Sequence, residues 1–394
     1  MHSRLLSLAL VALALAGCRL QQPQPTAAPP PAFLPDKLAA MDAAIEQAIA
    51  DRKCPGGVLW LERDGQSYHR AYGQRAVVPV PEPMTEDTIF DAASLTKVVA
   101  CAPAILRLVE LGKVGLDDPV GRHIPEFRGE GREAITVRQL LTHTSGLPPG
   151  ISASGWRGQQ GAIAKAATVK LETPPGTAFK YSDINFFLLG EIVQRASGRP
   201  LEVFVQQEFY GPLRMRDTGY LPPAAKLPRV APTEIEGTNP PLRGVVHDPT
   251  ARQMGGVAGH AGLFTTAADL ARFARMLLNE GELDGVRVLR PETVRAMTSV
   301  QTPVSLTAKR GFGWDIDSSY SGPRGEVFPV GSYGHTGWTG TSLWIDPGSR
   351  TFIIFLSNRN HPTKDGNVLP LRRQLGTLAA EAVGLSRSAP STNP

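Results

Sequence analysis

The sequence of 394 residues lacks several patterns, and each absence argues against a class of protein or site. Its arginines are scattered and no run of lysine or arginine alternates with aromatic residues, so we expect no nucleic-acid partner despite a net charge of +5. The patterns H-x-x-x-H and C-x-x-C are absent, which predicts no metal site, and we expect no cofactor. His143 and His260 are therefore expected to stabilise their loops through hydrogen bonds. The absence of G-x-S-x-G argues against the nucleophile of an α/β-hydrolase.

The first residues have the pattern of a bacterial export signal. An arginine near the start is followed by an apolar run that is too short for a stable membrane anchor, which predicts a signal peptide over residues 1–17. The run ends in Leu15-Ala16-Gly17-Cys18, which resembles the lipobox of bacterial lipoproteins, so Cys18 is the expected lipidation site. A simple signal peptide with a chance cysteine is the alternative.

The resemblance to a lipobox implies a protein of the bacterial cell envelope, anchored by lipid on the periplasmic face. Arg19 stands where an aspartate would suggest retention in the inner membrane, so the outer membrane is preferred. Residues 18–35, rich in proline and glutamine, are predicted to form an extended tether. Export would also permit a disulfide between Cys54 and Cys101, although Cys101 lies in an apolar helical stretch that favours an unpaired buried thiol.

Both ends of the chain carry helix and strand patterns that fit one sheet. Residues 36–52 place apolar side chains on one helical face, and a hairpin follows around Asp64-Gly65. Residues 334–359 have the pattern of two strands joined by a turn, and residues 369–385 that of a closing helix. We therefore predict an α/β (α+β) fold in which an antiparallel sheet, formed by residues 36–96 and 305–384, is flanked by helices.

The middle of the chain, residues 97–304, has a different pattern. Apolar helical runs alternate there with loops rich in proline and glycine, which predicts a large, mainly helical domain inserted into the sheet domain. A cleft between the two domains is the expected place for a functional site. Residues 385–394 are predicted to be a flexible tail.

Ser94 and Lys97 form an S-x-x-K motif at the start of a predicted helix, after the strand-like sequence TIFDA. Residues three apart lie on one face of a helix, so the amine of Lys97 is expected beside the hydroxyl of Ser94. An unpaired backbone N–H in the first turn, at the positive end of the helix dipole, would favour the charge of an oxyanion. The alternative is that Ser94 caps the helix and Lys97 is a solvated side chain.

Two further motifs follow in order, Tyr181-Ser182-Asp183 and His335-Thr336-Gly337. Together with S-x-x-K they resemble the serine β-lactamase and penicillin-binding protein superfamily, whose class C-like branch carries S-x-x-K, Y-x-N and K-T-G or H-T-G motifs. The resemblance covers residues 36–384, and the stretches LLTHTSGLP and VHDPTARQMGGVAGHAGLFTTAADLARF are similar to penicillin-binding protein 4B-like members. It implies a β-lactamase/transpeptidase-like fold.

The resemblance also implies a role for each matching residue. Ser94 would attack a carbonyl carbon and carry the acyl group, Lys97 would be the base, and Tyr181 would share in proton transfer. The backbone N–H groups of Ser94 and Trp338 would bind the oxyanion. The remaining contacts with substrate would come from the third motif and the residue after it: His335, Thr336, Gly337 and Trp338.

Two residues depart from the family pattern. Asp183 stands where asparagine is usual, and an ionised carboxylate cannot donate a hydrogen bond to a substrate carbonyl. It would instead hold Lys97 as an ammonium or bind a substrate amine, which weakens the case for Lys97 as the base and strengthens that for Tyr181. His335 replaces the usual lysine and would bind the carboxylate of a β-lactam or peptide terminus less firmly. The alternative role for His335 is a structural hydrogen bond between strands.

These features predict an envelope-anchored serine hydrolase that works through an acyl-enzyme on Ser94. The basic pI and the cell-wall location favour D-alanyl peptides or muropeptides as substrates, whereas Asp183 and His335 leave room for an esterase that acts on small esters. A protein that binds penicillins or muropeptides with little turnover is a further alternative, because a lysine locked in an ion pair is a poor base.

Overall fold

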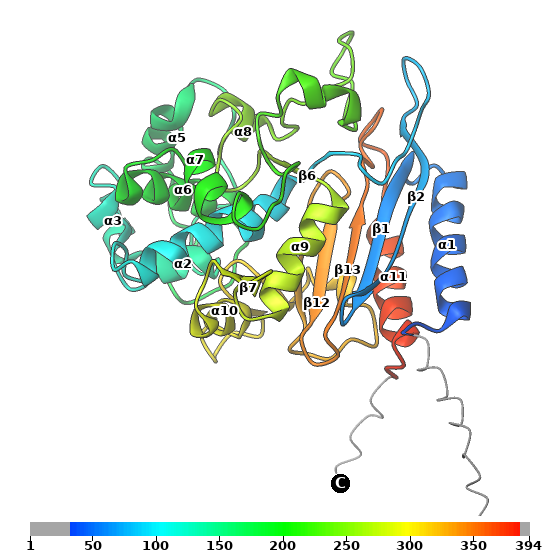
Figure 1. The fold of residues 1–394 in the computed structure, drawn as a ribbon. Helices are drawn as coiled ribbons and strands as arrows, with labels where there is room; N and C mark the ends of the chain where they lie inside the picture. The colour runs from blue at the N-terminus through cyan, green and yellow to red at the C-terminus, as the bar shows by residue number, and fades with distance from the viewer. Residues whose placement is uncertain (1–31, 387–394) are drawn as a thin grey trace, which may run out of the picture. The chain divides into compact units, whose positions relative to one another are not determined.

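The computed structural model describes residues 32–386, and its central feature is an eight-stranded sheet built from both ends of this part of the chain (Figure 1). Neighbouring strands in this sheet are antiparallel. The strands are, in their order across the sheet, β3 (Glu82–Pro83), β2 (Gln66–Ala76), β1 (Gly56–Arg63), β13 (Thr351–Leu356), β12 (Ser342–Asp346), β11 (Tyr333–Thr336), β10 (Asp315–Asp317) and β9 (Lys309–Arg310). The predicted antiparallel sheet formed by both chain ends is confirmed.

The pairing of β1 with both β2 and β13 joins the two ends. β1 and β2 form a hairpin whose two-residue turn holds Asp64 at a φ of 48° and Gly65 at a φ of 80°, the left-handed geometry of a tight hairpin turn. Val58 lies opposite Ala71 on one side and Leu356 on the other. Because side chains alternate along a strand, Val58 and its neighbours in β1 face different helical layers.

Helices cover both faces of the sheet. α1 (Pro35–Ala50) and α11 (Leu369–Ala382) pack against each other on one face, where Met41 and Ile45 of α1 join the buried core (Figure 1). α9 (Ala267–Leu278) packs on the opposite face, against β1 and β13. Since α9 lies within residues 97–304, the segment predicted to be a helical insertion also supplies one layer of the sheet region.

The helical region beside the sheet is built around α6 (Asp183–Ser197), which is buried from Ile184 to Val193 and packs against α2 (Ala102–Glu110). Its other helices are α3 (Val120–His123), α4 (Val137–Leu141), α5 (Gly158–Ala166), α7 (Leu201–Val205), α8 (Pro249–Gln253) and α10 (Pro291–Thr298). Two small sheets complete the region, one of β4 (Phe90–Asp91), β6 (Leu263–Thr265) and β5 (Gly219–Tyr220), the other of β7 (Glu282–Leu283) and β8 (Val286–Arg287).

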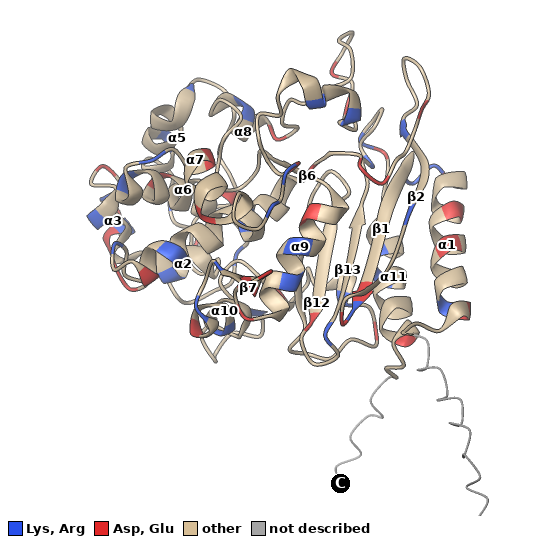
Figure 2. Cartoon of the chain, viewed as in Figure 1, with Lys and Arg blue, Asp and Glu red and all other residues tan. Residues whose placement is uncertain are grey.

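Charged residues of both signs are interspersed over the helices and loops (Figure 2). Within residues 32–386, no helix is both long and apolar enough to cross a membrane. The signal peptide, Cys18 and most of the tether lie before the described residues, and residues 387–394 of the tail lie after them. Those assignments therefore stay predictions.

Cys54 and Cys101 are both buried, and neither forms a disulfide. The Cys101 thiol lies 3.6 Å from the carbonyl oxygen of Phe186, inside the helical region. Burial raises the pKa of Cys54 to about 11, so this thiol stays protonated at neutral pH. Both cysteines are thus packing residues in this fold.

Candidate active site

Ser94 lies in a short 3₁₀ turn, Ala93–Leu95, that follows β4. Ala93 has a φ of 46°, a left-handed conformation that is strained for a residue with a Cβ atom. The carboxylate of Asp91 stabilises this turn, because it accepts hydrogen bonds from the N–H of Ala93 at 2.9 Å and the N–H of His247 at 2.7 Å. The fold thereby holds a partly buried Ser94 hydroxyl at the end of a strand.

A π-helical segment, Lys97–Cys101, follows Ser94 and continues into α2. The S-x-x-K spacing predicts the start of a regular α-helix, so the observed π-helical backbone differs from that prediction. The side chain of Lys97 nevertheless contacts Ser94. Lys97 Nζ donates hydrogen bonds to Ser94 Oγ at 2.9 Å and to the carbonyl oxygen of His260 at 3.1 Å. Lys97 is fully buried, which rules out the alternative of a solvated side chain.

The third partner of Lys97 Nζ is the Oδ1 atom of Asp183, at 2.7 Å. Burial lowers the pKa of Lys97, but the charge of Asp183 and the neighbouring Tyr181 raise it more, so the pKa lies above its ordinary value. Lys97 is therefore an ammonium at neutral pH. This geometry corresponds to the first role expected for Asp183, and Asp183 is absent from the wall of the cavity that Ser94 lines.

Tyr181 reaches the same place from the loop before α6. Its ring centre lies 5.0 Å from Lys97 Nζ, and the ring stacks on the imidazole of His143 with centroids 4.4 Å apart. His143 Nδ1 accepts hydrogen bonds from the N–H of Ser182 and the side-chain amide of Asn185, both at 3.1 Å. His143 stabilises a loop, as the sequence suggests, and that loop is the one that presents Tyr181.

The third motif lies on β11 and its end, directly beside the serine turn. Two threonines that follow it tie the two segments together, since Thr339 Oγ1 donates to the carbonyl oxygen of Asp91 at 2.7 Å and Thr341 Oγ1 to that of Ala92 at 2.9 Å. Gly337 has no room for a side chain, because a Cβ atom would lie 2.1 Å from Thr341 Oγ1 and 2.5 Å from the carbonyl oxygen of Ala92. The glycine of the motif is explained by this close approach.

His335 is buried on β11. Its Nδ1 donates to the carbonyl oxygen of Thr336 at 2.8 Å, because a carbonyl can only accept, and this leaves Nε2 as an acceptor with no partner among residues 32–386. Burial and the charges of Arg310 and Lys97 hold the pKa of His335 well below its ordinary value. His335 therefore offers a ligand a hydrogen-bond acceptor and no positive charge.

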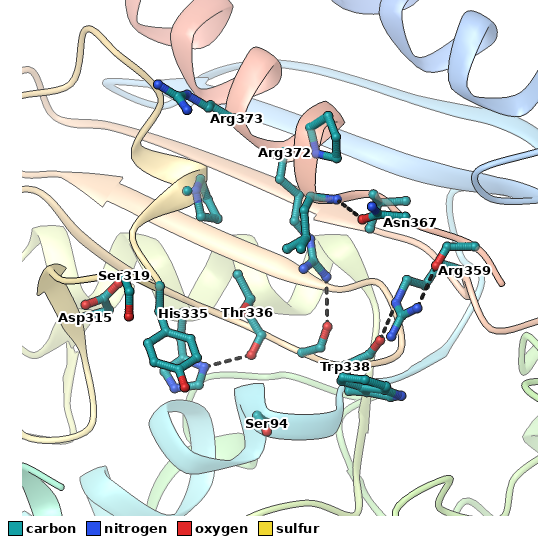
Figure 3. A pocket seen from close by; sticks show the side chains of 18 of the residues that line it. Ser94, Asp315, Ser319, His335, Thr336, Trp338, Arg359, Asn367, Arg372 and Arg373 are labelled. Carbon is teal, nitrogen blue, oxygen red and sulfur yellow. Dashed lines mark hydrogen bonds between the residues drawn. The ribbon is translucent and has the colours of Figure 1, made fainter. Parts of the chain in front are cut away.

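A cavity of about 970 Å³ opens over Ser94, which lies between His335 and Trp338 in Figure 3. The cavity wall includes the predicted nucleophile, Tyr181 and the four residues His335–Trp338. The side chain of Trp338 is 61% exposed, and the Arg359 guanidinium lies 4.6 Å from its ring centre. This volume accommodates a ligand much larger than a single amino acid.

The sequence gives no signal for several residues of the site. Arg310 and Arg372 are buried on the cavity wall. Arg310 lies 3.2 Å from the carboxylate of Asp315, and Arg372 donates hydrogen bonds to the carbonyl oxygens of Gly337 and Thr341. No spacing rule connects these arginines with the serine, because separate elements bring them together only in the folded chain. Within residues 32–386, no group of three or more histidine, cysteine or carboxylate side chains is placed to hold a metal ion.

Comparisons with known proteins identify the family of this chain. The family model described as Beta-lactamase matches residues 41–378. The chain is 34% identical over 371 residues to the N-acetylmuramyl-L-alanine amidase of Bacillus subtilis (strain 168), with 84% of this chain and 82% of the relative covered. It is 31% identical over 393 residues to the "Putative D-alanyl-D-alanine carboxypeptidase" of Escherichia coli (strain K12), with 89% of each protein covered.

Solved structures share the fold. EstCE1, described as a hydrolase with promiscuous acyltransferase activity, aligns with a TM-score of 0.71 at 22% identity over 87% of this chain and 98% of that one. A penicillin-binding protein homologue from Caulobacter crescentus aligns with a TM-score of 0.70 at 24% identity over 89% of this chain and 98% of that one. The β-lactamase/transpeptidase-like fold is confirmed, and the chain belongs to the β-lactamase family of serine hydrolases.

Proposed function

We propose that this protein is an envelope-anchored serine hydrolase that cleaves amide bonds of muropeptides through an acyl-enzyme on Ser94. The observation that carries the proposal is the 2.9 Å hydrogen bond from Lys97 Nζ to Ser94 Oγ, with Ser94 on the wall of a cavity of about 970 Å³. The names of two relatives, "N-acetylmuramyl-L-alanine amidase" and "Putative D-alanyl-D-alanine carboxypeptidase", support the substrate class, because each names an amide bond of cell-wall peptides.

The proposed reaction has two steps. Ser94 Oγ attacks the amide carbonyl carbon while its proton passes to the phenolate form of Tyr181, whose negative charge the ammonium of Lys97 stabilises before the transfer. The backbone N–H groups of Ser94 and Trp338 stabilise the oxyanion. The C–N bond then breaks, the amine leaves with the proton from Tyr181, and the acyl group remains on Ser94 as an ester. Water, deprotonated by Tyr181, hydrolyses this ester and releases a carboxylic acid and free Ser94.

The imidazole of His335 favours an interior amide over a C-terminal one. A β-lactam or a peptide that ends in D-alanine carries a carboxylate close to its reacting bond, and the neutral His335 with its Nε2 lone pair does not attract that carboxylate. An N-acetylmuramyl-L-alanyl peptide continues beyond the reacting bond as further amides, whose N–H groups match an acceptor. We therefore propose the amide bond between the muramyl group and L-alanine as the preferred bond for hydrolysis.

A D-alanyl carboxypeptidase is the second candidate. Arg359 and Arg372 line the same cavity and supply the positive charge that His335 lacks. A terminal carboxylate bound by either arginine would place a D-alanyl bond near Ser94.

A panel of three substrates tests the assignment. We expect the purified protein to hydrolyse an N-acetylmuramyl-L-alanyl peptide with a kcat/KM at least about tenfold above its values for a peptide ending in D-Ala-D-Ala and for p-nitrophenyl butyrate. Release of products is measured by chromatography or absorbance. Faster release of D-alanine would select the second candidate, turnover of the ester alone would select an esterase, and a persistent adduct without turnover would select a capture protein.

Anchoring through Cys18 is part of the proposal and rests on the lipobox-like sequence. In a bacterial host, the protein should sediment with membranes, and Cys18→Ala should move it to the soluble fraction because lipid attachment is lost. Hydrolysis should be unchanged, since every residue of the proposed site lies between 91 and 372. Fractionation with immunodetection measures the distribution of the protein between membrane and soluble fractions. A wild-type protein found in the soluble fraction would refute the lipid anchor and would leave the hydrolase assignment unchanged.

A further inference from the structure

A second cavity, of about 670 Å³, adjoins the active-site cavity along residues 359–366. Arg359, Asp365 and Gly366 line both cavities, so the two cavities share this part of their walls. The far wall of the second cavity comes from the end of α1 and from the β1–β2 region, and it includes Arg52 and Gln74. None of these residues takes part in the catalytic steps proposed above.

Arg359 and Arg52 give this second cavity an excess of positive charge. The Arg359 guanidinium donates to the carbonyl oxygens of Trp338 at 2.7 Å and Gly366 at 2.6 Å, and it forms no ion pair within residues 32–386. Arg52 is exposed and likewise has no carboxylate partner in the described part of the chain. Burial lowers the pKa of Arg359, which means that its surroundings disfavour the charge and that an anion would offset this cost.

Asp365 is the one acidic side chain on the wall of the second cavity. Its carboxylate accepts a hydrogen bond from Thr363 Oγ1 at 2.7 Å and pairs with no cation among residues 32–386. The neighbouring Lys364 is paired with Glu234 at 3.0 Å. Two guanidinium groups therefore face one carboxylate, so the wall suits a ligand with more carboxylates than amines.

The rest of the wall distinguishes a peptide from a small inorganic anion. Ile49, Val77 and Pro362 supply apolar surface, while Gln74 supplies a side-chain amide. A cavity of about 670 Å³ is also far larger than a phosphate or sulfate requires. Aliphatic surface, amide groups and separated charges are the features that bind a peptide segment.

We infer that the second cavity is a subsite for an acidic peptide, in which Arg52 and Arg359 bind carboxylates of the residues beyond the scissile amide and Asp365 accepts an N–H or ammonium group. The inference rests on the proposed function, because the reacting amide of the same peptide would lie at Ser94. A stem of three residues spans about 10 Å when extended and carries its carboxylates away from the reacting bond. The substrate class is thus narrowed to muropeptides with an acidic stem.

Kinetics with two matched substrates test the subsite. The substrates are an N-acetylmuramyl tripeptide with free carboxylates and the same tripeptide with those groups converted to carboxamides. We expect Arg52→Glu to raise KM for the acidic form by about five- to tenfold, with kcat within about twofold, and to leave the amidated form nearly unchanged. Arg128→Glu is the control, since Arg128 is exposed and lines neither cavity. Arg359 is left intact because it also supports Trp338.

Binding of the free acidic tripeptide to the Ser94→Ala variant, measured by calorimetry, separates the subsite from the catalytic proposal. Binding that Arg52→Glu weakens in this background supports the subsite even if no substrate is turned over. Three results would overturn the acidic-peptide subsite and leave the hydrolase assignment in place. They are an equal change in KM for both substrates, no change in KM for either substrate, and displacement of the tripeptide by inorganic phosphate at equal concentration.

Discussion

Replacing Ser94 by alanine should lower kcat/KM for an N-acetylmuramyl-L-alanyl peptide by at least about four orders of magnitude. The hydroxyl oxygen is the atom that forms the ester with the acyl group, and the hydroxyl proton is the one that passes to Tyr181 in the first step. The free energy of unfolding should change by less than about 1 kcal/mol, because the substitution removes one hydrogen bond at a partly buried position. Steady-state kinetics and urea unfolding measure the two quantities.

Ser154→Ala is the matched control for this variant, because Ser154 is exposed and lines neither cavity. It should retain full activity. Hydrolysis by Ser94→Ala within about tenfold of the wild-type rate would exclude an acyl-enzyme on this serine. A loss of activity accompanied by unfolding would instead indicate a structural role for the hydroxyl. A Ser94→Cys variant that is folded and partly active would argue against that structural role, because a thiol can also act as the nucleophile.

Replacing Lys97 by methionine should cost at least about two orders of magnitude in kcat/KM and should also destabilise the fold. The ammonium that stabilises charge at Tyr181 is lost, and Asp183 loses its partner at 2.7 Å. Breaking a fully buried pair costs about 3–5 kcal/mol, and we expect less here because the Asp183 side chain is 34% exposed. Kinetics and chemical unfolding of the same preparation measure both effects.

The double variant Lys97→Met/Asp183→Asn separates catalysis from stability. Removing both charges relieves the unpaired carboxylate, so the double variant should regain most of the lost unfolding free energy. It should not regain activity, because no ammonium faces the site. Recovery of activity together with stability would show that Lys97 serves only to hold Asp183.

The single variant Asp183→Asn tests which form of Lys97 works. Asp183 is a principal group that raises the pKa of Lys97 against the effect of burial, so removing its charge should lower that pKa. If the ammonium is the working form, kcat/KM of the variant should fall at alkaline pH values where the wild type is still active. Activity above wild type at neutral or alkaline pH would instead identify the neutral amine as the base.

The sheet could be predicted because its signals are local. The helix at 35–50, the turn at Asp64-Gly65 and the strands at both ends each follow from periodicity or turn chemistry within about twenty residues. The three motifs also pointed to one site, and the structure brings Ser94, Tyr181 and the third motif together on one cavity wall. The order of the three motifs along the chain was enough to predict a common site, although no distance between them was known.

Other features depend on tertiary contacts that no local pattern reports. The serine turn is held by Asp91 through the N–H of His247, more than 150 residues away, and Tyr181 is held by the ring of His143. The π-helical path after Ser94 could not be expected from S-x-x-K spacing, which fits a regular helix. The packing of α9 on the sheet likewise depends on the tertiary fold and cannot be predicted from the sequence pattern of residues 97–304.

The proposed reaction places the acyl group of the substrate on Ser94. It is tested most directly with the p-nitrophenyl ester of N-acetylmuramic acid, whose good leaving group makes deacylation the slow step. We expect a burst of p-nitrophenol equal to the enzyme concentration and, in quenched samples, one N-acetylmuramyl adduct that intact-mass analysis and peptide mapping locate on Ser94. Steady release without a burst, or an adduct that persists in Ser94→Ala, would contradict it.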